Sequence, residues 1–486
     1  MCHILPVGLQ NILHCRQPGM CQQGMTEGRN YHFFSHGGLN ILLDVPTGAV
    51  HVLDDIAAKV LPYFAAGNIK DMGKEFSSEI SEATLAWEQL QGLADGKMLF
   101  SPQPHFSQRP GGGELKALCL HVAHDCDLRC RYCFAGTGAF GGARTLMDLA
   151  TAKAAVDMLF SSAAKVYEID FFGGEPLLNL GVVEETSAYA RQQAKALGKK
   201  VNLTLTTNGY SMNQSVRDRL VALNLDIILS HDGRQDVHNA TRPCPGGLPS
   251  YQDITRNILE LVPRLGEKYY IRGTYTALNK DFVQDIRHWL DLGLRRFSME
   301  PVVLPPSSKM ALTQEDLAFL REQYWQLAEL AQEEPFTYFH FNLDWERGQC
   351  GARRASGCGA CIEYVAVDPK GGIFPCHQFV GEDAWQLGTV HTGITNKSIP
   401  EQFLKLGIES KPICQKCWAR FHCGGGCHAN AWWTNSNLDQ PYDLGCQLLK
   451  MRTEAAIYLK VKQALSLNCS EGDFHGIQKK GYKQAQ

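Results

Sequence analysis

The sequence predicts an α/β fold in which helices wrap a parallel sheet, preceded by a small strand-rich module and followed by a cysteine-rich region. From about residue 107 to 335, strand patterns alternate with helical patterns, as they do in parallel sheets with crossover helices. The segment before it, 31–106, opens with three short β-rich runs. The segment after it, 336–450, is dense in Cys and Gly and poor in periodicity, which indicates a fold organised around metal.

The composition is that of a water-soluble protein of 486 residues, long enough for about two to four domains. A net charge of −3 gives no global attraction to nucleic acid or to acidic membranes, so we expect neither as a partner. Disulfide-rich secreted scaffolds are short chains, so eighteen cysteines in a chain of this length favour a reducing cytoplasm. A signal peptide and a long apolar run are both absent from the sequence, which argues against secretion and membrane spanning.

Residues 1–30 show no clear periodicity, and we expect a disordered extension there. In segment 31–106, the runs YHFFSHGG, LNILLDV and GAVHVLD are separated by Gly-Gly and Pro-Thr-Gly turns and predict three strands. Two stretches with helical spacing follow them. Strands and helices together predict a winged-helix-like module. Such a module can recognise a peptide, pack against its neighbours or bind DNA, although no Arg/Lys-rich recognition helix is visible.

Six strands are predicted in the central segment, 107–335, each separated from the next by a helical pattern. They are residues 117–123, 167–172, 201–207, 225–230, 269–276 and 294–303. The final segment, 451–486, is amphipathic and then polar, and we read it as a C-terminal tail without a functional signal.

Directly after the first of these strands, Cys126, Cys130 and Cys133 are spaced Cys-x3-Cys-x2-Cys. Three thiolates from one loop can hold three irons of a [4Fe-4S] cluster. The fourth iron then has no ligand within the motif, so it can chelate the amino and carboxylate groups of a small molecule. A zinc site is the alternative, but zinc prefers four protein ligands; three unrelated buried thiols are the other alternative.

The run YEIDFFGGEPLL ends a predicted strand with Gly173, Gly174 and Glu175 at its carboxyl end, where parallel sheets bind ligands. Glycines there let backbone carbonyls approach a ligand closely. Together with the cysteine loop, this turn resembles the radical S-adenosylmethionine (SAM) superfamily. The resemblance implies a partial (β/α)6 TIM-like barrel and a SAM-binding [4Fe-4S] cluster.

The same resemblance implies a set of residues that contact SAM, most of them at strand ends. They are Tyr132, Gly173, Gly174, Glu175, Thr206, Asn208, Ser230, Asp232 and Arg272. Ser and Thr are also common at strand ends for turn geometry alone, so a structural role stays open for them. Glu300 is a similar case, and His231 stands where an apolar residue is usual, so it could simply fill a pocket.

A second cysteine array occupies the region 336–450 and resembles the SPASM extension of radical enzymes that modify peptides and proteins. Zinc ribbons are the alternative, since they share Cys-x2-Cys repeats. The resemblance implies one auxiliary [4Fe-4S] cluster on Cys414, Cys417, Cys423 and Cys446. It implies a second on Cys376, Cys427 and one or both of Cys358 and Cys361. The sequence leaves that last choice open.

A narrower resemblance, to the maturases of six-cysteine (SCIFF) peptides, appears in CFAGTGAFGG (133–142), CGACIEYVAVDPKGGIFPCHQFVGE (358–382) and GLNILLDVPTGAVHVLDD (38–55). It implies an oxidoreductase that installs thioether crosslinks in a Cys-rich precursor peptide. The chemistry would belong to the cofactor, with no catalytic acid or base, and with a flavodoxin- or ferredoxin-type electron donor. The peptide's leader would add as a strand to the N-terminal module. An anaerobic sulfatase maturase and a non-catalytic iron-sulfur electron carrier are the alternatives.

Overall fold

The computed structural model of the chain describes residues 4–6, 30–104, 113–343 and 355–470. Cys2, Cys15, Cys21 and Cys350 lie outside these ranges, as do residues 471–486 of the predicted tail. The break at 107–114, which separates the first two predicted domains, lies almost entirely outside them as well. None of the helices in the described ranges is long and apolar enough to cross a membrane.

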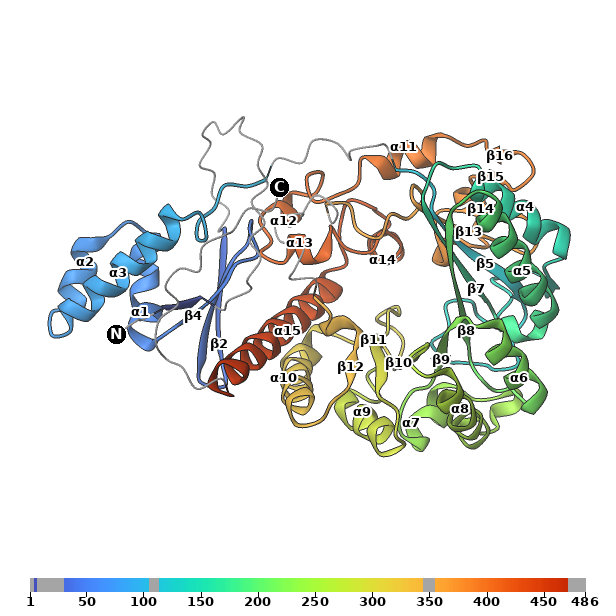
Figure 1. Cartoon of the computed structure of the whole chain (residues 1–486), viewed down its shortest axis with the longest axis horizontal. Helices are drawn as coiled ribbons and strands as arrows, with labels where there is room; N and C mark the ends of the chain where they lie inside the picture. The colour runs from blue at the N-terminus through green and yellow to red at the C-terminus, as the bar shows by residue number, and fades with distance from the viewer. Residues whose placement is uncertain (1–3, 7–29, 105–112, 344–354, 471–486) are drawn as a thin grey trace, which may run out of the picture.

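The N-terminal module is an antiparallel sheet covered by three helices (Figure 1). The three predicted strands are confirmed as β2 (Tyr31–His36), β3 (Leu39–Asp44) and β4 (Val50–Leu53). The helices are α1 (Asp55–Ala65), α2 (Ile69–Glu75) and α3 (Ile80–Asp95). Alternation along β3 sends Leu42 towards these helices, where it is buried with Val60 and Leu90 in a core of the module's own.

One further strand, β1 (Ile4–Pro6), pairs antiparallel with β4 and completes the sheet order β1-β4-β3-β2. For these three residues the expectation of a disordered extension is wrong. The reason is that backbone groups along the free edge of β4 offer hydrogen bonds to any extended segment, whatever its side-chain periodicity. The rest of the extension, 1–3 and 7–29, lies outside the described residues.

The central sheet confirms all six predicted strands, which run parallel in chain order (Figure 1). They are β5 (Ala117–His124), β7 (Val166–Gly173), β8 (Lys200–Thr207), β9 (Asp226–Ser230), β10 (Tyr269–Tyr275) and β11 (Arg296–Pro301). The helices between and after them are α4 (Leu149–Phe160), α5 (Leu180–Ala196), α6 (Gln214–Leu223), α7 (Gln235–Thr241), α8 (Tyr251–Leu265), α9 (Phe282–Asp291) and α10 (Leu317–Glu333). This parallel-strand α/β sheet is consistent with a partial TIM barrel.

The two faces of the central sheet differ in chemistry. Tyr167, Ile169 and Phe171 of β7 are buried on one face, and Glu168 and Asp170 point to the other. Figure 1 shows the helices packed outside the curved sheet, where they cover the apolar face. The inner face therefore presents polar side chains, which suits a site for a polar ligand.

The sheet continues beyond the six predicted strands at both edges. Short strand β12 (Thr337–Tyr338) pairs parallel with β11, and β13 (Tyr364–Val367) pairs parallel with β5. From β13 the sheet proceeds antiparallel through β14 (Gly372–Phe374), β15 (Gly388–Thr389) and β16 (Gly393–Ile394). The cysteine-rich region is thus joined to the central sheet by backbone hydrogen bonds.

The rest of the cysteine-rich region is helical and ends in a long helix. Its members are α11 (Ser398–Leu404), α12 (Pro412–Gln415), α13 (Arg420–Cys423), α14 (His428–Asn435) and α15 (Asp443–Ser470). Helix α15 crosses residue 450, where the sequence predicts a domain boundary, so the segment up to Ser470 is not a separate tail. The reason is burial: Leu448, Met451 and Ala455 belong to the main core, where α15 packs against α10.

Two stacked ring pairs attach the N-terminal module to this body. His32 of β2 lies on Trp418 with ring centroids 3.8 Å apart, and His36 lies on Trp325 with centroids 4.0 Å apart. His32 also contacts Glu454 of α15 at 2.9 Å between Nε2 and Oε1. Figure 1 shows β2 beside α15 accordingly.

Candidate functional site

The loop that carries Cys126, Cys130 and Cys133 begins directly after β5, at the carboxyl edge of the sheet. Backbone hydrogen bonds hold it to the segment after α7: Arg129 N donates to Pro243 O at 2.7 Å, and Arg131 N donates to Thr241 O at 2.9 Å. These two bonds flank Cys130 and fix the path of the chain on both sides of that thiol.

The three thiols of this loop are partly buried. Burial raises the pKa of Cys130 to about 12; attraction to Arg242 opposes the rise and repulsion from Cys133 adds to it. Burial likewise raises the pKa of Cys126, with Glu175 and Cys130 contributing repulsion. Raised pKa values keep these groups neutral thiols near pH 7, so binding of iron is what would make them thiolates.

In the described ranges, no group of three or more His, Cys, Asp or Glu side chains is placed to hold one metal ion. A cubane distributes its thiolate ligands over separate irons, so thiols of one loop need not surround a single point to fit it. Cys126, Cys130 and Cys133 are partly buried and lie on one loop, which fits a cluster better than a zinc ion with four protein ligands.

The Gly-Gly turn after β7 packs directly against the cysteine loop. Gly174 N donates to Ala123 O, and Glu175 N donates to Asp125 O, both at 2.7 Å. A Cβ on Gly174 would lie 2.2 Å from the Asp125 carbonyl oxygen, and Gly173 adopts a φ of +137°. Both positions therefore require glycine because backbone approaches backbone here, which is a role beyond the expected contact with SAM.

Glu175 ties the ends of β7 and β8 together. Its buried carboxylate accepts hydrogen bonds from Leu177 N at 2.9 Å, from Thr207 Oγ1 at 2.7 Å and from Asn208 N at 2.7 Å. Burial, with repulsion from Asp127, raises the pKa of Glu175 to about 8. Asn208 in turn lies against the cysteine loop, with Nδ2 at 2.7 Å from Asp127 Oδ1 and 3.6 Å from the Cys126 sulfur.

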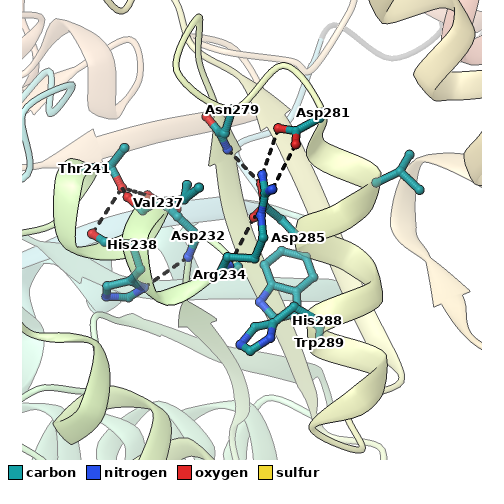
Figure 2. A network of polar contacts seen from close by, with 12 residues as sticks. Asp232, Arg234, Val237, His238, Thr241, Asn279, Asp281, Asp285, His288 and Trp289 are labelled. Atoms are coloured by element: carbon teal, nitrogen blue, oxygen red, sulfur yellow. Dashed lines mark hydrogen bonds and ion pairs between the residues drawn. The ribbon is translucent and has the colours of Figure 1, made fainter.

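Asp232, at the end of β9, is fully buried and its two oxygens are occupied by protein. Oδ2 accepts from Tyr132 Oη and from Thr241 Oγ1, both at 2.7 Å, and Oδ1 accepts from Thr274 N at 3.0 Å. Figure 2 shows Asp232 beside Thr241 and His238 of α7. This geometry favours a role in holding Tyr132 of the cysteine loop over direct contact with SAM.

The inner face of the sheet carries the other predicted contacts. Arg272 of β10 lies beside Ser230 of β9 in the strand register and is exposed despite its place in mid-strand. Asp170 accepts from Thr204 Oγ1 at 2.7 Å, and burial raises its pKa to about 6. Glu300 contacts His340, with Oε1 and Nε2 2.6 Å apart. Its pKa is low because attraction to His340 and Arg272 outweighs burial.

His231 fills a pocket in the protein interior, which is the role that the sequence analysis allowed for it. Its Nδ1 accepts from Trp289 Nε1 at 3.0 Å and from Gly233 N at 3.1 Å, and its Nε2 pairs with Thr255 Oγ1 at 3.0 Å. Burial holds the pKa of His231 well below its usual value. Both ring nitrogens are thus engaged by neighbouring side chains and backbone.

The cysteines of the second array fall into two groups. Cys446 is raised in pKa to about 12 by burial and by repulsion from Cys423, Cys414 and Cys417, so these four sulfurs are close together. In the second group, Cys376 is repelled by Cys427 and Cys358. Cys361 is buried in the main core, and burial alone raises its pKa, without a contribution from another cysteine. The backbone of Cys361 nevertheless lies close to this group, since Cys361 N donates to Pro375 O at 2.9 Å.

Several residues around the cysteine loop have no signal in the sequence. Arg242, Thr241 and Thr274 contact Asp232 because α7 and β10 converge on the end of β9. No local motif marks them, since their importance comes from the path of the chain. The Gly-rich spacing that points to Gly173 and Gly174 is by contrast local.

Acid is expected to destabilise this edge of the sheet through buried histidines. Burial lowers the pKa of His238 to about 3, so the ring is neutral in the folded chain, whereas in the unfolded chain it takes up a proton below about pH 6.5. The contribution of His238 to the free energy of unfolding is therefore fully present above about pH 6.5 and is lost as pH falls towards about 3. At pH 5 the loss is about 2 kcal/mol.

Chemical unfolding at pH 7 and pH 5 measures this loss. His238→Gln keeps an acceptor for Asp232 N, which lies 3.3 Å from His238 Nδ1, and should show a smaller drop in the free energy of unfolding between the two pH values. An equal drop in the variant and the unmodified protein would contradict this assignment.

The profile of the Radical SAM superfamily matches residues 120–232, which span the cysteine loop and the ends of β7, β8 and β9. The "Uncharacterized protein MJ0907" of Methanocaldococcus jannaschii is 26% identical over 200 residues, 41% of this chain and 66% of its own length. The "Cysteine-type anaerobic sulfatase-maturating enzyme" of Clostridium perfringens is 24% identical over 341 residues, 64% of this chain and 88% of its own.

Among solved structures, "Native anSMEcpe with bound AdoMet" superposes with a TM-score of 0.61 at 20% identity. The superposition covers 72% of this chain and 99% of that one, and it shows a shared fold. Residues 120–232, which carry the cysteine loop, thus match the Radical SAM superfamily, and the chain is similar in sequence to an anaerobic sulfatase-maturating enzyme and in fold to anSMEcpe.

Proposed function

We propose that this enzyme installs Cys-derived thioether crosslinks in a ribosomally made, Cys-rich precursor peptide. The observation that carries the proposal is the N-terminal module, which adds a sheet with its own core to the catalytic body. The sulfatase-maturase chain aligns over 99% of its length with 72% of this one, so more than a quarter of this chain is additional to it. An added module of this kind suits recognition of a peptide as an extra strand.

Cys126, Cys130 and Cys133 would hold the [4Fe-4S] cluster that binds SAM. When bound, this pair supplies a 5′-deoxyadenosyl radical, which removes hydrogen from an unactivated carbon that no acid or base can activate. The chain's own residues fix the loop: Glu175 joins the ends of β7 and β8, and Asn208 contacts Cys126. Arg272, exposed on the inner face, is suited to bind the carboxylate of the methionine moiety.

Crosslinking removes two hydrogens from the peptide, one from carbon and one from sulfur, and leaves one electron for the protein to take up. The cysteine group Cys414, Cys417, Cys423 and Cys446 would hold one auxiliary cluster as an acceptor. Cys358, Cys376 and Cys427 would provide ligands for another. A flavodoxin- or ferredoxin-type protein is the proposed electron donor, and the cytoplasm the proposed compartment.

A second candidate function is oxidation of one Cys or Ser residue to formylglycine. Its support is the near-complete alignment with the sulfatase-maturating chain and the 24% identity to such an enzyme. That reaction has no evident need for an N-terminal recognition module, which is why we rank it second.

Co-expression with a Cys-rich peptide encoded beside the enzyme distinguishes the two. Mass spectrometry is expected to show a loss of two hydrogens per crosslink together with loss of one free cysteine thiol, which oxidation of Ser to formylglycine would not consume, and co-expression with Cys130→Ala should leave the peptide unchanged. A gain of oxygen or a formylglycine residue in the peptide would reject thioether formation and favour the second candidate.

The edge of β4 is the proposed position for the peptide's leader, and β1 lies along that same edge. Strand β1 supports this assignment, because it pairs with the edge of β4 as an antiparallel strand. A leader would have to replace β1 there, so deletion of residues 1–6 should tighten leader binding severalfold, as measured by fluorescence anisotropy. Weaker binding after the deletion would mean that β1 forms part of the leader site.

A further inference from the structure

Arg242 is a buried cation beside the cysteine loop to which the proposed chemistry gives no role. It follows α7 directly and is only 8% exposed. Its Nε lies 3.0 Å from Asp232 Oδ1, in an ion pair whose geometry is not that of an aligned hydrogen bond. Its guanidinium carbon lies 5.5 Å from the centre of the Tyr132 ring.

The backbone on either side of Arg242 holds the cysteine loop. Thr241 O and Pro243 O accept hydrogen bonds from the amides of Arg131 and Arg129, which flank Cys130. The guanidinium also lies over the ring of Tyr132, which stands between Cys130 and Cys133 in the chain, so its charge is held at this part of the loop.

The electrostatics of the loop are asymmetric as a result. Cys126 lies beside Asp127 instead, with its sulfur 4.0 Å from an oxygen of the Asp127 carboxylate. Arg242 is a buried cation beside this loop, and a cluster with its thiolates becomes more negative when reduced. A fixed cation nearby favours that reduced state.

We propose that Arg242 is a positioning residue that raises the reduction potential of the cluster held by Cys126, Cys130 and Cys133, with Asp232 as the counterion that fixes its guanidinium. This inference rests on the proposed cluster at these three cysteines, and extends it to a residue that sets how readily the cluster accepts its electron. Charge and placement both matter, because Asp232 also anchors Tyr132 of the loop.

Arg234 offers a matched control within the same segment. Its guanidinium pairs with Asp281 at 2.8 Å and with the buried Asp285 at 2.8 Å, so it has the same chemistry, although its side chain is 31% exposed against 10% for Arg242. Figure 2 shows Arg234 with Asp281 and Asp285, on the opposite side of the view from Thr241. Loss of its charge should destabilise the fold without altering the cluster.

The test is a redox titration of the full-length protein with its clusters, without peptide, following the electron paramagnetic resonance signal that changes when SAM is added. Iron content is measured in parallel. Arg242→Gln is expected to shift the midpoint potential to a more negative value, Arg242→Lys to restore most of it, and Arg234→Gln to leave it unchanged. Asp232→Asn, which removes the counterion, should shift it to a more positive value.

Unchanged potentials in Arg242→Gln and Asp232→Asn, with iron content preserved, would overturn the inference. If Arg242→Gln fails to retain iron, retention by Arg242→Lys supports the role of the charge, and loss in both variants overturns it. Absence of the SAM-responsive signal from the unmodified protein would instead reject the proposed function itself, so the two failures are distinguishable.

Discussion

Replacement of Cys130 with alanine is expected to reduce the formation of 5′-deoxyadenosine from SAM to the level of a protein-free control. The loop around Cys130 is held by the amides of Arg129 and Arg131, so the backbone keeps its path when the thiol is removed. What is lost is one of the three thiols in the loop, and residues 126–133 contain no fourth cysteine to replace it. The product is measured by liquid chromatography after anaerobic reconstitution with iron, sulfide and a strong reductant.

Cys244→Ala is the matched control for this variant. Cys244 is also buried and lies close in sequence to the segment that holds the loop, but its sulfur meets the Pro249 carbonyl oxygen, at 3.9 Å, and the Tyr210 hydroxyl. The same chemical change there should leave turnover near that of the unmodified protein. Full turnover by Cys130→Ala would refute the assignment of the cluster to this loop.

Gly174→Ala is expected to have an effect nearly as large, although it changes a single methyl group. The added Cβ would lie 2.2 Å from Asp125 O and 2.8 Å from Gly138 O, both backbone atoms of the cysteine loop. Neither atom can move aside as a side chain would, so the loop must shift away from β7. We expect a cost of about 1–3 kcal/mol in folding stability and a loss of both bound iron and SAM affinity.

Gly181→Ala provides the comparison, since it lies on α5 and a Cβ there meets nothing within 4 Å. Alanine in that helix should be neutral or slightly stabilising. Iron content and equilibrium dialysis with SAM, measured for both variants, decide the question. Equal iron and SAM binding in the two would show that close packing of β7 against the loop is not needed.

The central fold could be predicted from the sequence because its signals are local. Each of the six strands is a short run of apolar residues with helical spacing on either side, and all six are found. Strands β12 and β13 were missed for a physical reason. β12 has only two residues, and β13 lies in a segment whose Cys and Gly content masks a four-residue run. Strand β1 likewise forms through pairing with β4, and no side-chain pattern in residues 4–6 predicts that pairing.

Some parts of the site could likewise be predicted from the sequence, and others could not. The spacing of Cys126, Cys130 and Cys133, and the glycines beside Glu175, can be read from the sequence because neighbours in the chain are neighbours in space. The surroundings of Asp232 cannot, since its partners arrive from the cysteine loop, α7 and β10. Cys361 and Cys358 are three residues apart, yet Cys361 has a φ of +70° and is buried while Cys358 is exposed, a difference that their spacing does not predict.

Electron paramagnetic resonance of the reduced, iron-loaded protein tests the vacant coordination position at Cys126, Cys130 and Cys133 most directly. Addition of SAM labelled with ¹⁵N or ¹⁷O in its methionine moiety should change the spectrum and introduce hyperfine coupling to the label, because the labelled atoms bind the iron that no cysteine holds. A protein that contains only zinc, or an iron signal that labelled SAM leaves unchanged, would contradict the account.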